Sequence, residues 1–399
     1  MNVSVFYLSL SALISSTGAT LFVSALALSL FSLDSSAVKA SGVYIAQFLP
    51  VIFLLPLAVK ICDSYTVRGG LVLIEILSAI CAVCMGLCVD ADWLILLYFI
   101  LFVRGFLELV TKTFRSVGVK KFTGPSSLGR ANNIVMGGSF VGQALGALAG
   151  FILVSEVTLL QIAIINGFTY LISALCCARM ASADVVRETM PSGLNSSLAG
   201  LVEIKKNESL KLNFIYLSLS VIVFQSYNQI ARTWIPLAWL DLGLGKGIIG
   251  EMVGCVGIVI GLLIVNSFVP SNKNNKSLAF FSILLTSSFL SAPFVSSNSV
   301  ISLFFYFFYM VLFEISLMVS MNGVLAACPT HRVASVMGLF YGFSFGGLTI
   351  AGLLIAFATD FYRLPAVSLV LSAVALIFLF SISFLLVWSR DKTSTAKPG

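Results

Sequence analysis

The sequence predicts an all-helical integral membrane protein with twelve membrane-spanning helices in two pseudo-symmetric six-helix halves. Of the 399 residues, 59% are hydrophobic and only 10% are charged, whereas soluble domains average roughly 45–50% apolar and about 25% charged residues. The mean hydropathy is +1.06. Because one spanning helix needs about 20 apolar residues, the chain has room for on the order of 12 spans and no sizeable soluble domain. Soluble catalytic domains, nucleotide-binding cassettes and DNA-binding domains are therefore disfavoured.

Long apolar runs, separated by charged or Gly-, Pro- and Asn-rich segments, define the elements in order. The first half contains six of them, which we place at 4–31, 38–61, 70–89, 93–117, 128–154 and 158–179. The second half contains six more, at 211–239, 246–269, 277–296, 298–327, 333–359 and 364–389. The run at 298–327 is long enough to cross the bilayer with a tilt.

One long polar segment lies between the sixth and seventh runs. It divides the chain into an N-terminal six-helix bundle at 1–179, a cytoplasmic linker at 180–210 and a C-terminal six-helix bundle at 211–399. Such a layout is typical of a duplicated transporter, whose substrate site lies near the membrane midplane between the halves. An unrelated polytopic protein with a long loop at this point is the alternative.

The placement of Lys and Arg predicts the orientation. With both termini in the cytoplasm, 18 of the 23 basic residues, Lys112 and Arg115 among them, fall on the inner side and three on the outer side. The remaining two, Arg104 and Arg232, lie within spans. This segregation follows the positive-inside rule, so the formal net charge of +7 needs no nucleic acid to explain it. The basic side can also favour anionic membrane lipid.

The loop after the second run, LPLAVKICDSYTVRGGL, carries an acid and a base on the inner side. We expect Asp63 at the N-terminal end of the third span, where the positive end of the helix dipole stabilises an acid. We expect Arg68 to pair with a carboxylate or carbonyls of a neighbouring helix. The loop resembles the cytoplasmic loop motif of the major facilitator superfamily, in which such residues latch a conformation, although Val59 and Val67 depart from it. A generic charged loop is the alternative.

The fifth run, GGSFVGQALGALAG, has glycines at every fourth position, Gly138, Gly142 and Gly146. Such spacing leaves one helix face bare, so that another helix can approach closely. The stripe resembles the antiporter motif of exporters in the same superfamily, with Gln143 in place of a proline. Together with Arg104 and the glycine after it, which are similar to the family's motif in the fourth span, it makes the chain resemble bacterial drug and siderophore exporters. A simple packing stripe is the alternative.

Three ionisable residues lie deepest in the predicted spans. Each costs at least about 2.5–3.5 kcal/mol near the bilayer centre, so each indicates a function or a partner. Arg104 and Glu108 are four residues apart on one helix face and can pair. We expect them to line a central cavity, with Glu108 exchanging a proton; a permanent structural pair is the alternative. Glu314 has no basic neighbour within a turn and is a second candidate proton carrier, the alternative being a neutral, hydrogen-bonded carboxylic acid.

The seventh run, VFQSYNQIARTWIPLAW, has a polar face in an apolar helix. Gln225, Asn228 and Arg232 share that face, and we expect them to contact substrate in the cavity. Tyr227 and Trp234 offer aromatic surface nearby. Snorkelling of Arg232 to the interface is the alternative. Glu75 and Glu251 are expected at the membrane interface.

The chain lacks the residues for several kinds of chemistry. With a single histidine, His331, no histidine-based metal site or catalytic triad can be built, and no phosphate-binding G-x-x-x-x-G-K-[ST] loop is present. We therefore expect neither an enzyme nor a bound metal or cofactor. An ion gradient, or the gradient of the substrate itself, must supply the energy.

These observations predict a secondary active transporter in a bacterial cytoplasmic (inner) membrane. By its resemblance, it exports an amphipathic small molecule such as a drug, a siderophore or a peptide-like metabolite, by proton antiport with alternating access. Its expected partners are this substrate, protons and membrane lipid, and the chain is expected to act as a monomer. The alternatives are a proton-coupled importer of a nutrient or metabolite and, from another class, a transport-inactive membrane sensor or lipid-handling protein.

Overall fold

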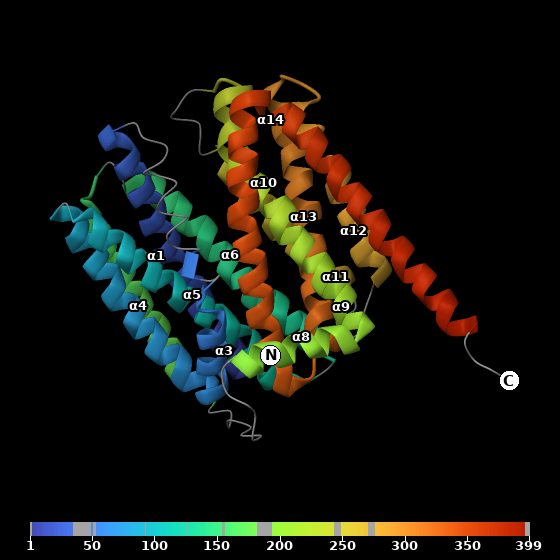
Figure 1. Ribbon diagram of the computed structural model, residues 1–399. Coiled ribbons are helices and arrows are strands. Elements are labelled where there is room, and N and C mark those ends of the chain that lie inside the picture. Colours follow the sequence, from blue (N-terminus) through green and yellow to red (C-terminus); the bar gives the residue numbers. More distant parts are fainter. Residues whose placement is uncertain are drawn as a thin grey trace.

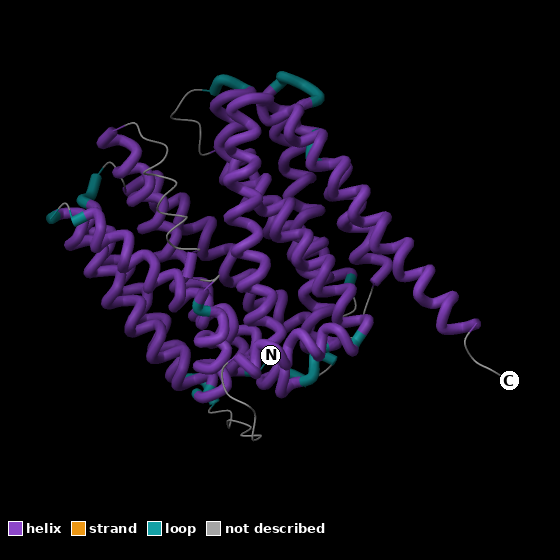
Figure 2. The backbone as a smooth tube through the Cα atoms, in the orientation of Figure 1, coloured by secondary structure: helices purple, strands orange, loops and turns teal. Residues whose placement is uncertain are grey.

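The computed structural model describes residues 2–34, 49–50, 53–91, 93–124, 126–153, 156–181, 194–242, 249–269 and 276–395. Regular secondary structure in these ranges is helical throughout, with short loops between long helices (Figure 2). Among the described residues, nine helices are long and apolar enough to cross a membrane, and one of these, Thr330–Ile382, contains two helices joined at a kink.

The first half of the chain forms a bundle of long helices. Most of the second predicted span, and residues 182–193 of the predicted linker, lie outside the described residues. The helices are α1 (Val3–Asp34), α3 (Leu55–Ser64), α4 (Val67–Asp90), α5 (Leu94–Phe122), α6 (Leu128–Leu153) and α7 (Leu159–Ala178). A further helix, α8 (Leu194–Lys206), lies within the predicted linker.

The second half forms a corresponding bundle. Its first span contains two π-helical segments and consists of α9 (Glu208–Leu219), η1 (Ser220–Gln225), α10 (Ser226–Trp234) and η2 (Ile235–Trp239). The remaining elements are α11 (Ile249–Phe268), α12 (Lys276–Phe289), η4 (Ala292–Phe294), α13 (Ser299–Ala327), η5 (Thr330–Arg332) and α14 (Val333–Thr395). Within α14 the backbone of Arg363 is not helical, with φ 59° and ψ 150°. Pro365 follows, and because proline lacks a backbone N–H the helix breaks here, between the two predicted runs.

A side-chain cap fixes the start of α4. Thr66 accepts a hydrogen bond from the backbone N–H of Gly69 at 3.1 Å and so begins α4. This corrects the prediction for Asp63, which lies in the last turn of α3 and not at the start of the next span. The cap is a hydroxyl, which satisfies a free N–H at the helix start without a charge.

The two bundles stand side by side and diverge toward one end (Figure 1). The start of α1, the end of α14, α3 and α8 lie toward the other end (Figure 1). There, hydrogen bonds connect the halves: the Asn132 amide donates to Asn322 at 2.9 Å, Asn322 donates to Asn133 at 2.9 Å, and the Ser116 and Tyr341 hydroxyls are 3.0 Å apart. The predicted orientation assigns this closed end to the cytoplasm.

The glycine stripe of α6 packs directly on α1. A Cβ atom at Gly142 would lie 2.2 Å from the carbonyl oxygen of Leu13, and one at Gly146 would lie 2.3 Å from that of Thr17. At Gly138 the nearest atom, the carbonyl oxygen of Ser9, would be 2.6 Å away. No side chain fits at these distances, so the glycines allow the backbones to touch and hold one wall of the space between the halves in place.

Candidate functional site

A cavity of about 290 Å³ lies between the two bundles. Residues of α1, α4, α5, α6 and α7 form one wall, and residues of α9, η1, α10, α11, α13 and α14 form the other. We call these the N-half wall and the C-half wall. The volume is close to the lower end of the usual range for small-molecule sites, about 300–1,000 Å³.

A ladder of charges on α5 runs along the N-half wall. Arg104, Glu108 and Lys112 follow one another at four-residue intervals. The Arg104 Nη1 and Glu108 Oε2 atoms are 2.8 Å apart, and the Lys112 Nζ and Glu108 Oε1 atoms are 2.7 Å apart. Lys112, which was counted with the inner-side residues, lies within α5 and lines the cavity.

Tyr170 of α7 holds the first member of this ladder. The Arg104 Nε donates to the Tyr170 hydroxyl oxygen at 2.9 Å, Nη2 donates to the same oxygen, and the guanidinium lies 5.4 Å from the ring centroid. The Arg104 side chain is only 5% exposed. Its position is therefore fixed from two helices.

A second ion pair connects α4 to α5. The Arg115 Nη2 lies 3.1 Å from the Glu75 Oε1 and donates to the Ser15 hydroxyl at 2.8 Å. Glu75 was predicted at the interface and Arg115 on the inner side. The structure places Glu75 in the cavity wall with Arg115, and not at the interface. A signal was present in the sequence, because positions 104, 108, 112 and 115 share one face of a 3.6-residue helix.

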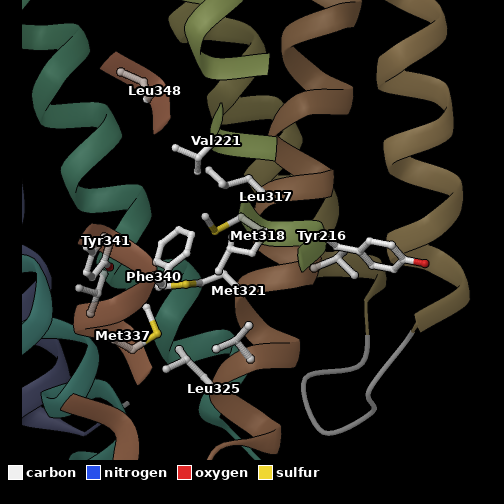
Figure 3. Packing of buried hydrophobic residues seen from close by; sticks show 14 of the residues in the cluster. Tyr216, Val221, Leu317, Met318, Met321, Leu325, Met337, Phe340, Tyr341 and Leu348 are labelled. Carbon is white, nitrogen blue, oxygen red and sulfur yellow. The ribbon is translucent and has the colours of Figure 1, made fainter. Parts of the chain in front are cut away.

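The C-half wall is mainly apolar, and Figure 3 shows several of its side chains, among them Met318, Phe340 and Leu348. Its apolar residues come from α9, η1, α13 and α14: Leu217, Val221, Phe313, Leu317, Met318, Met321, Phe340, Tyr341, Phe345 and Leu348. The Lys112 ammonium reaches across the cavity to within 4.2 Å of the Phe345 ring centroid. Polar and apolar surfaces therefore face each other across a narrow space.

The C-half wall also carries one ion pair. The Arg232 Nη1 of α10 lies 3.0 Å from the Glu251 Oε1 of α11, and both residues line the cavity. Glu251 was expected at the interface; its partner on the neighbouring helix places it in the cavity wall instead.

The predicted polar face of the seventh span is only partly at the cavity. Gln225 and Arg232 line it, together with Gln229, which the prediction omitted. Asn228 lies one position away, roughly 100° around the helix, and accepts a hydrogen bond from the Tyr306 hydroxyl at 2.6 Å. Asn228 is therefore not a lining residue, because α13 occupies its side of the helix.

The two aromatic residues predicted beside that face also point elsewhere. The Tyr227 hydroxyl donates to the carbonyl oxygen of Leu290 at 2.9 Å, and the side chain is fully buried. Trp234 packs edge-on against Phe294, with ring centroids 6.1 Å apart. Neither is among the residues lining the cavity. Both side chains serve packing within the C-terminal bundle.

Glu314 is fully buried just behind the C-half wall. Neither carboxyl oxygen has a hydrogen-bond partner among the described residues, so the hydrogen-bonded alternative is not observed. Glu314 shares a helix face with Met318 and Met321, which line the cavity. It lies about one turn further along, where α11 covers it: a Cβ atom at Gly261 would lie 2.8 Å from the Glu314 Cβ.

The other predicted residues lie outside this arrangement or at its edge. Asp63 and Arg68 are exposed around the turn between α3 and α4, away from the cavity lining. Gln143, on the glycine helix α6, does line the cavity. Within the part of the chain that the structure describes, no group of three or more His, Cys, Asp or Glu side chains is placed to hold a metal ion.

Comparisons with known proteins agree with this architecture. The model of the major facilitator superfamily matches residues 8–345. No curated protein sequence matches the chain. The solved structures it resembles include those of three transporters, with which it shares low sequence identity.

A bacterial homologue of the iron transporter ferroportin, in an outward-facing state, is 17% identical, with 96% of this chain and 100% of that chain covered and a TM-score of 0.69. The Escherichia coli fucose:proton symporter FucP is 12% identical, with 95% of this chain and 98% of that chain covered and a TM-score of 0.73. The human organic anion transporter MFSD10 is 12% identical, with 95% of this chain and 98% of that chain covered and a TM-score of 0.72. At these identities the likeness shows the fold, not the cargo.

The match extends over most of the chain and confirms the predicted all-helical, twelve-helix fold. A protein of this fold with a cavity between its halves moves its substrate through the membrane by alternating access. The chain therefore belongs to the major facilitator superfamily and is a multi-pass secondary active transporter, not an enzyme.

Proposed function

We propose that this transporter exports an amphipathic small molecule, of the kind represented by drugs, siderophores and peptide-like metabolites, by proton antiport. The observation that carries the proposal is the two-sided cavity. Charges and hydroxyls line the N-half wall, whereas Phe340, Phe345, Met318 and other apolar side chains line the C-half wall. A molecule with one polar end and one apolar body can satisfy both walls at once.

Glu314 is the better candidate for the coupling proton. Glu108 lies between two cations, which stabilise its carboxylate. Glu314 has no such support, and burying a carboxylate without a partner is costly. A shift of α11 along α13 within the C-terminal bundle, coupled to the rocking of the halves, would uncover Glu314 beside Met318. The proton would then bind or leave in one conformation and be sealed in the other.

Outward transport is supported by the glycine stripe of α6, which resembles the exporter motif and which packs on α1. The basic residues at the closed end support a cytoplasmic position for that end in a bacterial inner membrane, with both termini inside. Asp63 and Arg68, at the α3–α4 turn on this side, fit a conformational latch. In this proposal the transporter acts as a monomer, and its two bundles comprise residues 1–179 and 211–399.

A proton-coupled importer is the second candidate. The observation in its favour is the structural likeness to FucP, described as a fucose:proton symporter. Import and export are distinguished by the direction of substrate flux under an imposed pH gradient. A symporter moves substrate in the same direction as the protons, and an antiporter moves it in the opposite direction.

The test is substrate flux in inside-out membrane vesicles with an imposed pH gradient. An exporter takes up one or more members of a panel of anionic, neutral and cationic amphipathic probes when the vesicle interior is acidic. Glu314→Gln is expected to abolish the response to the gradient while leaving the protein in the membrane. Glu208→Gln, an exposed carboxylate at the start of α9, is the matched control and should transport normally.

Loss of a probe from vesicles under the same gradient would overturn export in favour of import. A full gradient-driven rate in Glu314→Gln would remove Glu314 from the coupling step. No flux of any panel member, with the protein folded, would support the sensor or lipid-handling alternative.

A further inference from the structure

The charges that line the cavity do not cancel. Among the described lining residues, four are basic and three are acidic: Arg104, Lys112, Arg115 and Arg232 against Glu75, Glu108 and Glu251. Two of these carboxylates each pair with one cation, Glu75 with Arg115 and Glu251 with Arg232. Glu108 is shared between Arg104 and Lys112. One positive charge is therefore left over, and it belongs to the α5 ladder.

The excess charge is accessible at Lys112. Its side chain is 30% exposed, whereas that of Arg104 is 5% exposed and anchored to Tyr170. A lysine ammonium has three donors, and the ion pair with Glu108 leaves others to meet a ligand. Low-dielectric walls strengthen the attraction of an unbalanced charge for a counterion. The cavity is thus built to receive one negative charge next to Lys112.

The surroundings of Lys112 indicate what else the ligand carries. Phe345 lies 4.2 Å away on the opposite wall, and Phe340 and Met318 continue the same apolar surface. A small inorganic anion would leave that surface uncovered. A molecule with an apolar body fills it while its charged end stays at the ladder.

We infer that the cargo is an amphipathic organic anion whose carboxylate, sulfonate or phosphate group binds the Lys112 ammonium, with its apolar body against Phe345, Phe340 and Met318. The inference rests on the transport function proposed above and names the class of molecule transported. In the bound state the anionic group and Glu108 share the Lys112 ammonium, which restores neutrality at the ladder.

The first experiment measures the potential of the cavity without any cargo. In Ala19→Cys, a thiol is introduced at a position on α1 that lines the cavity. This thiol is treated with two methanethiosulfonates, the anionic sulfonatoethyl reagent and the cationic trimethylammonioethyl reagent. For each reagent the wild-type background rate is subtracted. The remaining rate is divided by the rate at which the same reagent modifies free mercaptoethanol. We expect the normalised ratio to favour the anion by about tenfold. Adding Lys112→Gln should remove this preference, whereas adding Lys112→Arg or the exposed control Lys60→Gln should keep it.

The second experiment measures ligand selectivity. Dansylglycine, dansylamide and dansylethylenediamine share one aromatic body and differ in charge. Their fluorescence is titrated with wild-type protein in phosphatidylcholine nanodiscs, and signals from empty nanodiscs are subtracted. We expect dansylglycine to bind at least about tenfold tighter than the neutral and cationic compounds. Lys112→Gln should reduce this difference to within about threefold, and Lys112→Arg should preserve it.

Equal binding of the three compounds, preference for the cation, or no binding of dansylglycine would overturn the inference, and so would unchanged selectivity in Lys112→Gln. These outcomes are separate from the flux test. Anion-selective binding without gradient-driven flux would refute antiport but keep the cargo class. Gradient-driven flux of neutral or cationic probes alone would keep the transporter proposal and refute the anionic cargo.

Discussion

The carboxylates of the N-half wall and the carboxyl group behind the C-half wall are buried in opposite ways. On the N-half wall, Glu75 and Glu108 each lie within 3.1 Å of a basic side chain supplied by α5. Behind the C-half wall, Glu314 lies among apolar side chains with no hydrogen-bond partner for either oxygen among the described residues. The N-half charges form a fixed electrostatic surface, whereas Glu314 gains least from remaining charged. We expect the first wall to recognise the cargo and the second to respond to protons.

The largest effect should come from breaking a pair on the N-half wall. Arg115→Met leaves the Glu75 carboxylate buried without its cation, and removal of one partner of a buried pair costs about 3–5 kcal/mol. We expect a marked fall in the Tm of the purified protein, which is measured by tryptophan fluorescence. The double variant Glu75→Gln with Arg115→Met should recover most of the Tm that Arg115→Met alone loses. Exposed Lys211→Met serves as the control, and an unchanged Tm in Arg115→Met would show that the pair does not hold α4 to α5.

A smaller effect of opposite sign is expected behind the C-half wall. Glu314→Met replaces an unpartnered buried carboxyl with an apolar side chain of similar length, and relief of an unsatisfied polar group is worth about 1–3 kcal/mol. The Tm should rise. The same substitution in the N-half wall, Glu108→Met, removes the shared partner of two cations and should lower the Tm. If both substitutions lower it equally, the two walls do not differ in the way described.

The smallest effect should come from the contact that connects the walls. Phe345→Leu removes the ring next to the Lys112 ammonium, and a cation–π contact contributes about 0.5–2 kcal/mol. We expect a slight fall in Tm and weaker protection of Lys112 from acylation by an amine-reactive reagent. Phe343→Leu on the same helix, where the side chain is 62% exposed, is the matched control. Equal behaviour of the two variants would show that the ring contact has no energetic role.

Features within a single helix were predicted well from the sequence. Apolar runs marked most of the spans, and the four-residue spacing of Arg104 and Glu108 predicted that they can pair, since neighbours on a helix face are close wherever the helix lies. The inner boundary of the fourth span was set too early, at residue 117, although α5 extends to Phe122. Lys112 and Arg115 fall inside even the shorter predicted span, on the same face as that pair, but they were counted with the inner-side residues.

Contacts between helices could not be read from the sequence. Nothing local to Asn228 shows that Tyr306 of α13 will bind it, and nothing local to Glu251 shows that Arg232 will be its partner. The same holds for Gly261, whose missing side chain lets α11 cover Glu314. Such pairings depend on how two helices are rotated and spaced, which residues far apart in the chain decide together.

The sequence by itself determined that this chain spans a membrane many times, that it has a duplicated layout and that a few charged residues lie within its spans, because hydropathy and helical periodicity are local properties. Only the tertiary structure decided which of those charges meet. It assembled Arg104, Glu108, Lys112 and Arg115 into one polar wall with Glu75, placed an apolar wall opposite, and left Glu314 sealed behind it. The physical reason is that the energy of a buried charge depends on its neighbours in space, and these come from other helices.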